Sequence, residues 1–246
     1  MLRRSSVPSP TLLPEDEAFL AAYRPGAFPR PSVTVDVVAL TIQDGGLRVL
    51  LIKRGEPPFR GRWALPGGFV RVGGGAKGRG ESLDEAVARE LSEETGLTPR
   101  QVYVEQLGAF GEPERDPRMR VISVAYYALV RPDLVPRVRA GGDASEAAWL
   151  EPSPKRELAF DHAAIIEAAR KRIRERIDGS AIAASLVPAR FTIPELRTAY
   201  AIVTGEKQDP GNFRRRFQSM LDARVVERAP GMRATSSKPA AIYKFR

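Results

Sequence analysis

The chain has 246 residues, of which 43% are hydrophobic and 28% are charged, a balance typical of a folded globular protein. It contains no cysteine, which excludes disulfides, thiol nucleophiles, thiolate zinc sites and iron–sulfur ligation. With the single histidine His162, a multi-histidine metal site is also excluded, so carboxylates and carbonyls would hold any divalent cation, which favours Mg²⁺ or Mn²⁺.

Nothing in the sequence indicates a membrane span or an export signal. No apolar run approaches the length that crosses a bilayer. Residues 1–14 include Arg3 and Arg4 but no apolar segment after them, unlike a secretory signal. We therefore expect a cytoplasmic protein without a membrane partner.

The positive charge is concentrated near the end of the chain. The net charge is +9; residues 189–246 carry 12 Lys or Arg against 5 Asp or Glu, whereas residues 1–188 carry 27 against 25. A basic module on a nearly neutral body is typical of proteins that contact nucleic acid. A solvated basic surface explains the charge equally well, so charge alone leaves both interpretations open.

The first part of the chain is predicted from its strand-like runs. Residues 1–31, rich in Pro, Ser and Arg with a helical pattern at Pro14–Tyr23, form an N-terminal extension. Runs of β-branched and aliphatic residues then predict strands, because these side chains favour a pleated surface. The runs are Val33–Ile42, Leu47–Lys53 after a Gly45-Gly46 turn, Trp63–Val70 interrupted by Pro66-Gly67-Gly68, Val102–Leu107, Val121–Val130 and Ala147–Leu150.

Two helices are expected among these strands. Ser82 and Glu85 form a capping box at the start of the first, and Gly96 ends it. The second covers Asp161–Asp178, where isoleucines recur at helical spacing opposite Arg and Lys. We place this first domain, of the α/β class, at residues 32–180.

A second, smaller domain is predicted at residues 181–246, after a link around residues 179–190. Thr192 and Glu195 form a capping box, so a helix begins there and ends near Val203. The other predicted elements are a helix from Asp209-Pro210, a strand at Val225–Arg228, a turn at Pro230-Gly231 and a strand at Ala241–Phe245. Together they predict a winged helix-turn-helix with its wing at Ala229–Lys238.

Three carboxylates share one face of the first helix. Glu90, Glu93 and Glu94 are spaced i, i+3 and i+4, so they repel each other unless a positive group neutralises them. A hard cation would do so and would gather pyrophosphate oxygens at the same point. The alternative is a solvated glutamate-rich helix in which Arg89 pairs with Glu93.

These carboxylates lie in a recognisable pattern. Gly75-x5-Glu81-x7-Arg89-Glu90-Leu91-x-Glu93-Glu94-x-Gly96-Leu97 resembles the Nudix box. The resemblance, over about residues 32–178, implies an α/β/α sandwich that cleaves or binds nucleoside diphosphates linked to another group. It also implies Mg²⁺ held by Gly68, Glu81, Glu90 and Glu94, with Glu90, Glu93 and Glu94 as the catalytic residues of an active enzyme.

The chain departs from the family pattern at one point. The box glycine normally belongs to the Gly-Gly that ends a strand, here Gly67-Gly68, but Glu81 follows Gly68 by thirteen positions instead of six. Seven residues have been inserted, and Gly75 restores the formal spacing. We expect this insertion to displace the Gly68 carbonyl from the metal shell.

The helix after Asp209 has an apolar and a polar side. Phe213, Phe217, Met220 and Leu221 should be buried. Asn212, Arg215, Ser219 and Gln218 form an exposed stripe that can hydrogen-bond base edges, while Arg214, Arg216 and the wing residue Lys238 can hold phosphates. A small helical tail that packs on the body or mediates assembly is the alternative.

The combination of the two domains resembles the NrtR family of Nudix-related transcriptional regulators. The supporting stretches are Pro31–Asp36, Lys53–Phe59, Trp63–Phe69, Arg115–Arg118, Leu158–His162 and Asn212–Arg215. The resemblance implies a homodimeric repressor of NAD biosynthesis or salvage genes that binds a palindromic DNA operator and is released by ADP-ribose. The alternative is a Mg²⁺-dependent ADP-ribose pyrophosphatase, and one protein could combine both functions.

Six residues are candidates for the ligand site. Arg54, Arg62 and Arg118 could clamp a diphosphate, because guanidinium groups match phosphate oxygens. Phe69 and Phe160 could stack on adenine, and His162 could touch the ligand or cap its helix. The alternatives are surface arginines and core aromatic residues.

Overall fold

The structure is a computed structural model that describes residues 11–73, 80–137, 144–234 and 238–246. It divides into two units, Met1–Pro31 and Ser32–Arg246. The first unit contains helix α1 (Pro14–Ala22) and the 3-10 helix η1 (Pro25–Ala27), neither of which has a buried residue. Proline in its first turn and the acidic residues that follow favour the start of α1, as predicted.

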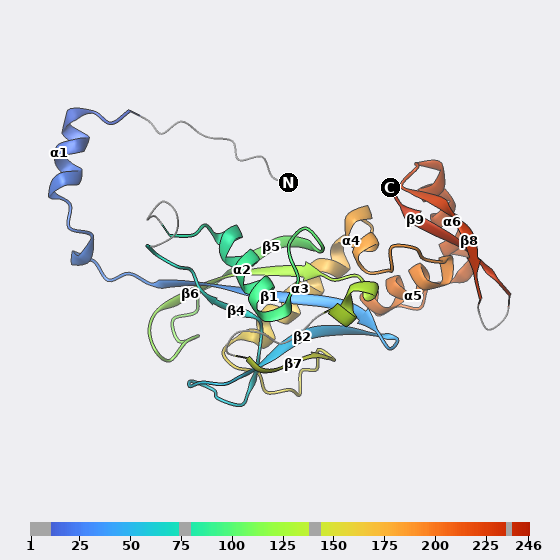
Figure 1. Cartoon of the computed structure of the whole chain (residues 1–246), viewed down its shortest axis with the longest axis horizontal. Helices are drawn as coiled ribbons and strands as arrows, with labels where there is room; N and C mark the ends of the chain where they lie inside the picture. The colour runs from blue at the N-terminus through green and yellow to red at the C-terminus, as the bar shows by residue number, and fades with distance from the viewer. Residues whose placement is uncertain (1–10, 74–79, 138–143, 235–237) are drawn as a thin grey trace. The chain divides into compact units, whose positions relative to one another are not determined.

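The second unit begins with a mixed seven-stranded sheet (Figure 1). Its strands are β1 (Ser32–Gln43), β2 (Gly46–Arg54), β3 (Trp63–Ala64), β4 (Gly67–Phe69), β5 (Tyr103–Phe110), β6 (Val121–Leu129) and β7 (Ala144–Leu150). The strand order is β3-β2-β1-β6-β5, with β4 paired to β1 and β7 paired to β2. The central strand β1 runs parallel to β6 and antiparallel to β2 and β4.

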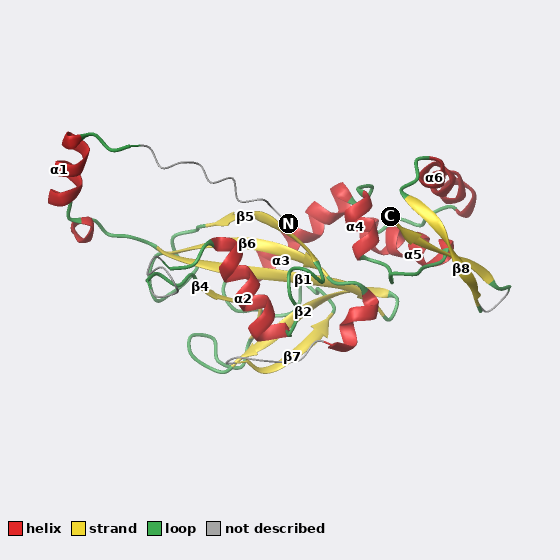
Figure 2. Cartoon of the chain, turned by 45° about the horizontal axis from the view of Figure 1, so that its top comes forward, coloured by secondary structure: helices red, strands yellow, loops and turns green. Residues whose placement is uncertain are grey.

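Helices cover both faces of this sheet (Figure 2). Along β1, Val35, Val37 and Ala39 belong to one buried cluster, which also contains residues of α2 (Leu83–Thr95). Val38 and Leu40 belong to another cluster, which contains residues of α3 (His162–Arg176). Because successive side chains of a strand point to opposite faces, this alternation produces the α/β/α sandwich expected from the sequence.

The winged helix domain follows α3. It contains α4 (Ser180–Ser185), α5 (Ile193–Thr204), α6 (Pro210–Asp222), β8 (Val226–Arg233) and β9 (Ala240–Phe245). Its buried residues, including Tyr200, Phe213 and Phe217, join the same cluster as the isoleucines of α3. One continuous core therefore connects the sheet, α3 and the helix-turn-helix.

The link expected around residues 179–190 contains helix α4, whose Ile182, Ala183, Leu186 and Val187 are buried against the common core, so a packed helix joins the two domains. One local prediction is wrong. The turn expected at Pro230-Gly231 is an irregularity inside β8, because the pairing register with β9 shifts between Ala229 and Met232. This irregularity is a β-bulge, in which residues of one strand have no partner on the other. Bulges favour Pro and Gly as turns do, so the sequence alone does not distinguish them.

Three shorter elements complete the comparison with the sequence. The predicted strand Trp63–Val70 is divided into β3 and β4 around Pro66. A 3-10 helix, η2 (Pro132–Arg137), follows β6. Within the described ranges, no helix combines the length and the apolar composition that a membrane span requires.

Candidate ligand-binding and DNA-binding sites

Helix α2 is positioned by its cap and by two glycines. Ser82 accepts a hydrogen bond from the Glu85 backbone N–H, and Gly96 ends the helix in the left-handed conformation, as predicted. A Cβ at Gly68 would lie 2.3 Å from Oε1 of Glu90, and a Cβ at Gly67 would lie 2.3 Å from the Val35 carbonyl oxygen. Strand β4 therefore fits between β1 and α2 only because both residues lack a side chain.

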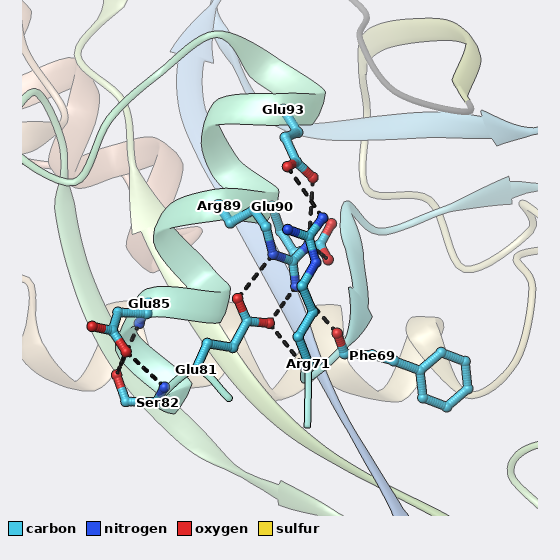
Figure 3. Close-up of polar contacts among 8 residues, drawn as sticks. All are labelled: Phe69, Arg71, Glu81, Ser82, Glu85, Arg89, Glu90 and Glu93. Atoms are coloured by element: carbon cyan, nitrogen blue, oxygen red, sulfur yellow. Dashed lines mark hydrogen bonds and ion pairs between the residues drawn. The ribbon is translucent and has the colours of Figure 1, made fainter. Parts of the chain in front are cut away.

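Arg89 is the centre of the acidic cluster (Figure 3). Its guanidinium donates to both carboxylate oxygens of Glu81, at 2.5 and 3.0 Å, and to Glu90 at 2.5 Å. It also contacts Glu93 at 3.3 Å and the Phe69 carbonyl oxygen at 3.1 Å. The protein thus supplies a cation where the sequence alone suggested a metal ion, and the expected Arg89–Glu93 pair is one part of a larger network.

The seven-residue insertion leaves the cluster intact. The Arg71 backbone N–H donates to the Glu81 carboxylate at 2.9 Å, and the Glu81 N–H donates to the Arg71 carbonyl at 3.0 Å. These two hydrogen bonds hold Arg71 and Glu81 together. Gly68 lies close against Glu90 of α2, so β4 packs on this helix despite the insertion; the displacement of the Gly68 carbonyl from a metal shell stays a prediction. Gly75 lies outside the described residues.

Burial and pairing with Arg89 shift the pKa values of the carboxylates in different directions. Burial raises the pKa of Glu90 above its ordinary value even though Arg89 opposes the shift, whereas hydrogen bonds from Arg89 lower the pKa of Glu81. Glu94 is also buried, and Glu93 is about half exposed. Glu81, Glu90 and Glu94 offer the oxygen donors that Mg²⁺ prefers. In the part of the chain that the structure describes, however, no three acidic or histidine side chains form a metal-binding group.

Five of the six predicted ligand residues line one cavity of about 190 Å³. They are Arg54, Phe69, Arg118, Phe160 and His162, brought together from β2, β4, the loops before β6 and α3, and the first residue of α3. Gly67 and Gly68 line the same cavity, so β4 connects it to the acidic cluster. The sixth residue, Arg62, does not line it: its guanidinium pairs with Glu157 at 3.2 Å.

Two guanidinium groups lie on aromatic rings in this cavity. Arg54 lies 4.9 Å and Arg118 lies 5.8 Å from the centre of the Phe160 ring, and Arg118 also lies 5.2 Å from Phe69. Burial and the neighbouring Arg118 lower the pKa of Arg54. Arg118 pairs with Asp116 at 2.8 Å, whereas Arg54 donates to the Pro58 carbonyl oxygen at 2.8 Å. Arg54 is therefore the cation whose charge an anionic ligand in this cavity would balance.

A buried polar network that was not predicted forms part of the lining of this cavity. Arg115 donates to both oxygens of Asp161, at 2.6 and 2.9 Å, and lies 3.4 Å from Asp36. Burial alone would raise the pKa of Asp36, but His162, Ser123 and Arg115 outweigh it and hold the pKa below its ordinary value. Asp36 could have been noticed as a charged residue inside the apolar run of β1.

His162 belongs to this network rather than to the open part of the cavity. Its Nδ1 accepts a hydrogen bond from the Leu65 backbone N–H at 2.8 Å, and its Nε2 lies 3.4 Å from Asp36. Because a backbone N–H only donates, Nδ1 carries no proton and Nε2–H faces the carboxylate. His162 is 3% exposed, so its contacts fix the start of α3 against the sheet.

Helix α6 has the two sides predicted from the sequence. Phe213 and Phe217 are buried, whereas Met220 and Leu221, also expected in the core, are only partly buried against it. The predicted DNA-binding residues of α6 are all exposed: Asn212, Arg214, Arg215, Arg216, Gln218 and Ser219. Arg215 donates to the Asn212 side-chain oxygen at 2.5 Å, which pre-orients the two central residues of the stripe.

The predicted phosphate-contacting residues differ in their surroundings. Arg214 and Lys238 line a groove between the starts of α5 and α6 and the wing strand β9. Arg216 instead pairs with Asp178 at 3.1 Å and lies over the Tyr200 ring, 5.1 Å from its centre. Arg216 is therefore directed toward the end of the first domain.

Comparisons with known families agree with this two-part structure. Residues 31–175 match the NUDIX domain family, and residues 183–245 match the NrtR DNA-binding winged helix domain. The chain is 34% identical over 230 residues to the ADPR responsive transcriptional repressor NtrR of Acinetobacter baylyi, covering 94% of this chain and 88% of that one. It is 41% identical over 137 residues to an ADP-ribose pyrophosphatase of Methanocaldococcus jannaschii, covering 56% of this chain and 72% of that one.

Two solved structures extend the similarity. NrtR of Shewanella oneidensis, complexed with a 27mer DNA, is 31% identical with a TM-score of 0.73, covering 87% of this chain and 93% of that chain. The NUDIX domain of the same protein, complexed with ADP ribose, is 37% identical with a TM-score of 0.56, covering 64% of this chain and 98% of that chain. With a NUDIX domain over more than half of its length and an NrtR winged helix after it, the chain belongs to the NrtR family.

Proposed function

We propose that the protein is a transcriptional repressor that binds operator DNA through its winged helix and is released by ADP-ribose bound in its Nudix domain. The observation that carries this proposal is the exposed pair of Asn212 and Arg215 on α6. Buried phenylalanines lie on the opposite side of the helix, and Arg214 flanks the pair. A rigid helix with one exposed polar face can enter a major groove. The relatives that bind DNA and respond to ADPR support the proposal.

The cavity around Phe160 is the proposed effector site. Arg54 and Arg118 would hold the diphosphate, and Phe69 or Phe160 would stack on adenine. The cavity of about 190 Å³ is smaller than the ~300–1,000 Å³ of pockets that enclose a drug-sized ligand. ADP-ribose would therefore occupy it with one part and extend along its open side.

Three further features complete the proposal. The protein acts as a homodimer, because two winged helices are needed to match a palindromic operator. Its regulated genes serve NAD biosynthesis or salvage, whose metabolites carry the ADP-ribosyl group. It acts in the cytoplasm, where it would meet both operator and effector.

The experiment selects binding sequences from a random double-stranded DNA library and then measures their affinity by fluorescence anisotropy with increasing ADP-ribose. We expect a palindromic sequence that is bound tightly and released by ADP-ribose. Arg54→Ala should bind this sequence as the wild type does but require more ADP-ribose for release. If selection enriches no sequence above random DNA, the repressor function is wrong.

A second candidate function is ADP-ribose hydrolysis. The intact Glu81, Glu90 and Glu94 favour it, and so does the similarity to a pyrophosphatase, which together with the NUDIX match indicates use of a divalent metal in general. For Mg²⁺ to bind, Glu81 or Glu90 would have to exchange its contact with Arg89 for the cation. Water would then add to the pyrophosphate and release AMP and ribose 5-phosphate.

The test incubates the protein with ADP-ribose and Mg²⁺ and separates the products by chromatography, with Glu94→Gln as the comparison. Turnover that the substitution abolishes would establish the enzyme. Equal product from both proteins would exclude hydrolysis at this helix. Calorimetric titration with Mg²⁺ alone tests the metal site independently, because Glu90→Gln should weaken the binding.

A further inference from the structure

Helix α3 connects the effector cavity to the DNA-binding helices. At its start, Asp161 is held by Arg115, and His162 lines the cavity. A helix of fifteen residues spans about 22 Å. Beyond its other end, Asp178 reaches the helix-turn-helix, so one rigid element lies between the two proposed binding sites.

Asp178 meets both helices of the helix-turn-helix. Its carboxylate pairs with Arg216 of α6 at 3.1 Å. The same guanidinium lies on the ring of Tyr200, a fully buried residue of α5 that packs edge-on against Phe213. Burial and the nearby Asp178 raise the pKa of Tyr200 to about 12. Asp178, Tyr200 and Arg216 therefore form a junction of three elements.

The other contacts between α3 and α5 do not by themselves fix the orientation of the helices. Arg174 donates to the Val203 carbonyl at 3.3 Å, and apolar residues of both helices share one buried cluster. Apolar burial holds helices together but is not directional. An ion pair at the edge of such an interface can set the rotation of α6 about its contact with α5.

The ion pair of Asp178 and Arg216 can also break, so that Arg216 binds another anion. The side chains of Asp178 and Arg216 are 72% and 46% exposed, so their attraction is weak and a DNA phosphate can compete for the guanidinium. A movement of α3 would change the position of Asp178 and hence what Arg216 contacts. The local pair of Lys171 and Glu175 on α3, 3.9 Å apart, offers no such connection.

We propose that Asp178 is a positioning residue that couples the Nudix domain to the recognition helix through Arg216. This inference rests on the proposed function, because it concerns how ADP-ribose alters operator binding. The coupling is the ratio of operator dissociation constants with and without saturating ADP-ribose. By linkage, operator DNA must change the affinity for ADP-ribose by the same ratio.

The experiment measures this ratio by fluorescence anisotropy in the full chain, and the affinity for ADP-ribose alone by calorimetry. In Asp178→Asn we expect the ratio to fall at least about threefold, while the affinity for ADP-ribose stays within about twofold of wild type. Glu175→Gln makes the same charge change in the last turn of α3, three residues before Asp178, and should leave the ratio unchanged. Asp178→Lys combined with Arg216→Glu restores an ion pair and should recover part of the ratio.

The possible failures can be told apart. A wild-type ratio of one would contradict the proposed effector response and would leave Asp178 nothing to couple. A large wild-type ratio that Asp178→Asn retains would overturn the role of Asp178 alone. If the reversed pair recovered nothing although Asp178→Asn had lowered the ratio, the contact with Arg216 would be excluded as the means of coupling.

Discussion

Helices α2 and α6 are each thirteen residues long, and each begins at a side-chain cap, yet their charges are placed in opposite ways. In α2, Glu90 and Glu93 face Arg89 of the same helix. In α6, Arg214 and Arg215 are exposed and make no ion pair with the described residues, whereas Arg216 pairs with Asp178. Charge that is compensated within the protein stabilises the fold, whereas charge left facing water remains available to a partner.

The largest expected effect comes from removing the compensation in α2. Arg89→Met keeps the apolar stem but leaves Glu81 and Glu90, whose side chains are 14% and 7% exposed, without their cation. Removing one partner of a buried pair costs about 3 kcal/mol of stability. Urea unfolding at pH 7 measures this loss, which should shrink at lower pH as the carboxylates accept protons.

Arg71→Met is the matched control. Its side chain is 63% exposed and makes one ion pair, with Glu93 at 3.5 Å, so the expected loss is below about 1 kcal/mol. Equal losses for the two substitutions would mean that Arg89 does not compensate the cluster.

On α6 the comparison predicts a loss of DNA affinity without a loss of stability. Arg215→Ala should weaken binding to the selected operator by about 2 kcal/mol, roughly 30-fold, because a base contact is lost. Arg214→Ala should weaken binding to all DNA and lower the slope of log affinity against log salt by about one. Anisotropy titrations at several salt concentrations separate the two, and equal losses of Arg215→Ala on operator and random DNA would contradict its assignment.

A smaller effect tests how closely β4 packs on α2. Gly68→Ala would place a methyl group 2.3 Å from Oε1 of Glu90 and should cost about 1–2 kcal/mol by overpacking. Gly108→Ala, in β5, meets no atom within 4 Å and should be nearly neutral. Thermal unfolding of both variants measures the difference, and a neutral Gly68→Ala would show that Glu90 can move away freely.

The smallest effects are two pH dependences of opposite sign. The folded-state pKa of Glu90 is raised above 4.5, so its contribution to stability is present below that pH and is lost as the pH rises. The stability of Glu90→Gln relative to the wild type should therefore increase between pH 4 and pH 7.

The folded-state pKa of Asp36 is lowered below 3.8, so its contribution is present above that pH and lost as the pH falls. The advantage of the wild type over Asp36→Asn should grow as the pH rises through this range. Urea unfolding across pH 3–7 measures both, and a shared sign would contradict the assigned environments.

Much of the local structure could be predicted because it depends on neighbours in the chain. The caps at Ser82 and Thr192 and the stop at Gly96 involve residues at most four positions apart, so short motifs determine them. The turn predicted at Pro230-Gly231 was wrong because that prediction also used only neighbouring residues. A bulge and a turn share their local signal, and only pairing with β9 distinguishes them.

The sites were predictable as residue types rather than as contacts. Arg54, Arg118 and Phe160 suit a diphosphate ligand, and the structure brings them into one cavity, but nothing local separates them from Arg62, which points elsewhere. Asp36 and Arg115 escaped prediction because they are 79 positions apart and become partners only when β1 lies beside the loop before β6.

By itself, the sequence determined the two domains, their helices and the polar faces of α2 and α6, because periodicity and caps act over one or two helical turns. Only the tertiary structure decided which charges are neutralised. Arg89 meets Glu81 and the Phe69 carbonyl because β4 packs on α2 and Glu81 is hydrogen-bonded to Arg71. Arg216 meets Asp178 because a common core brings α3 beside α5. Electrostatic partners depend on distance in space, which the order of residues does not specify.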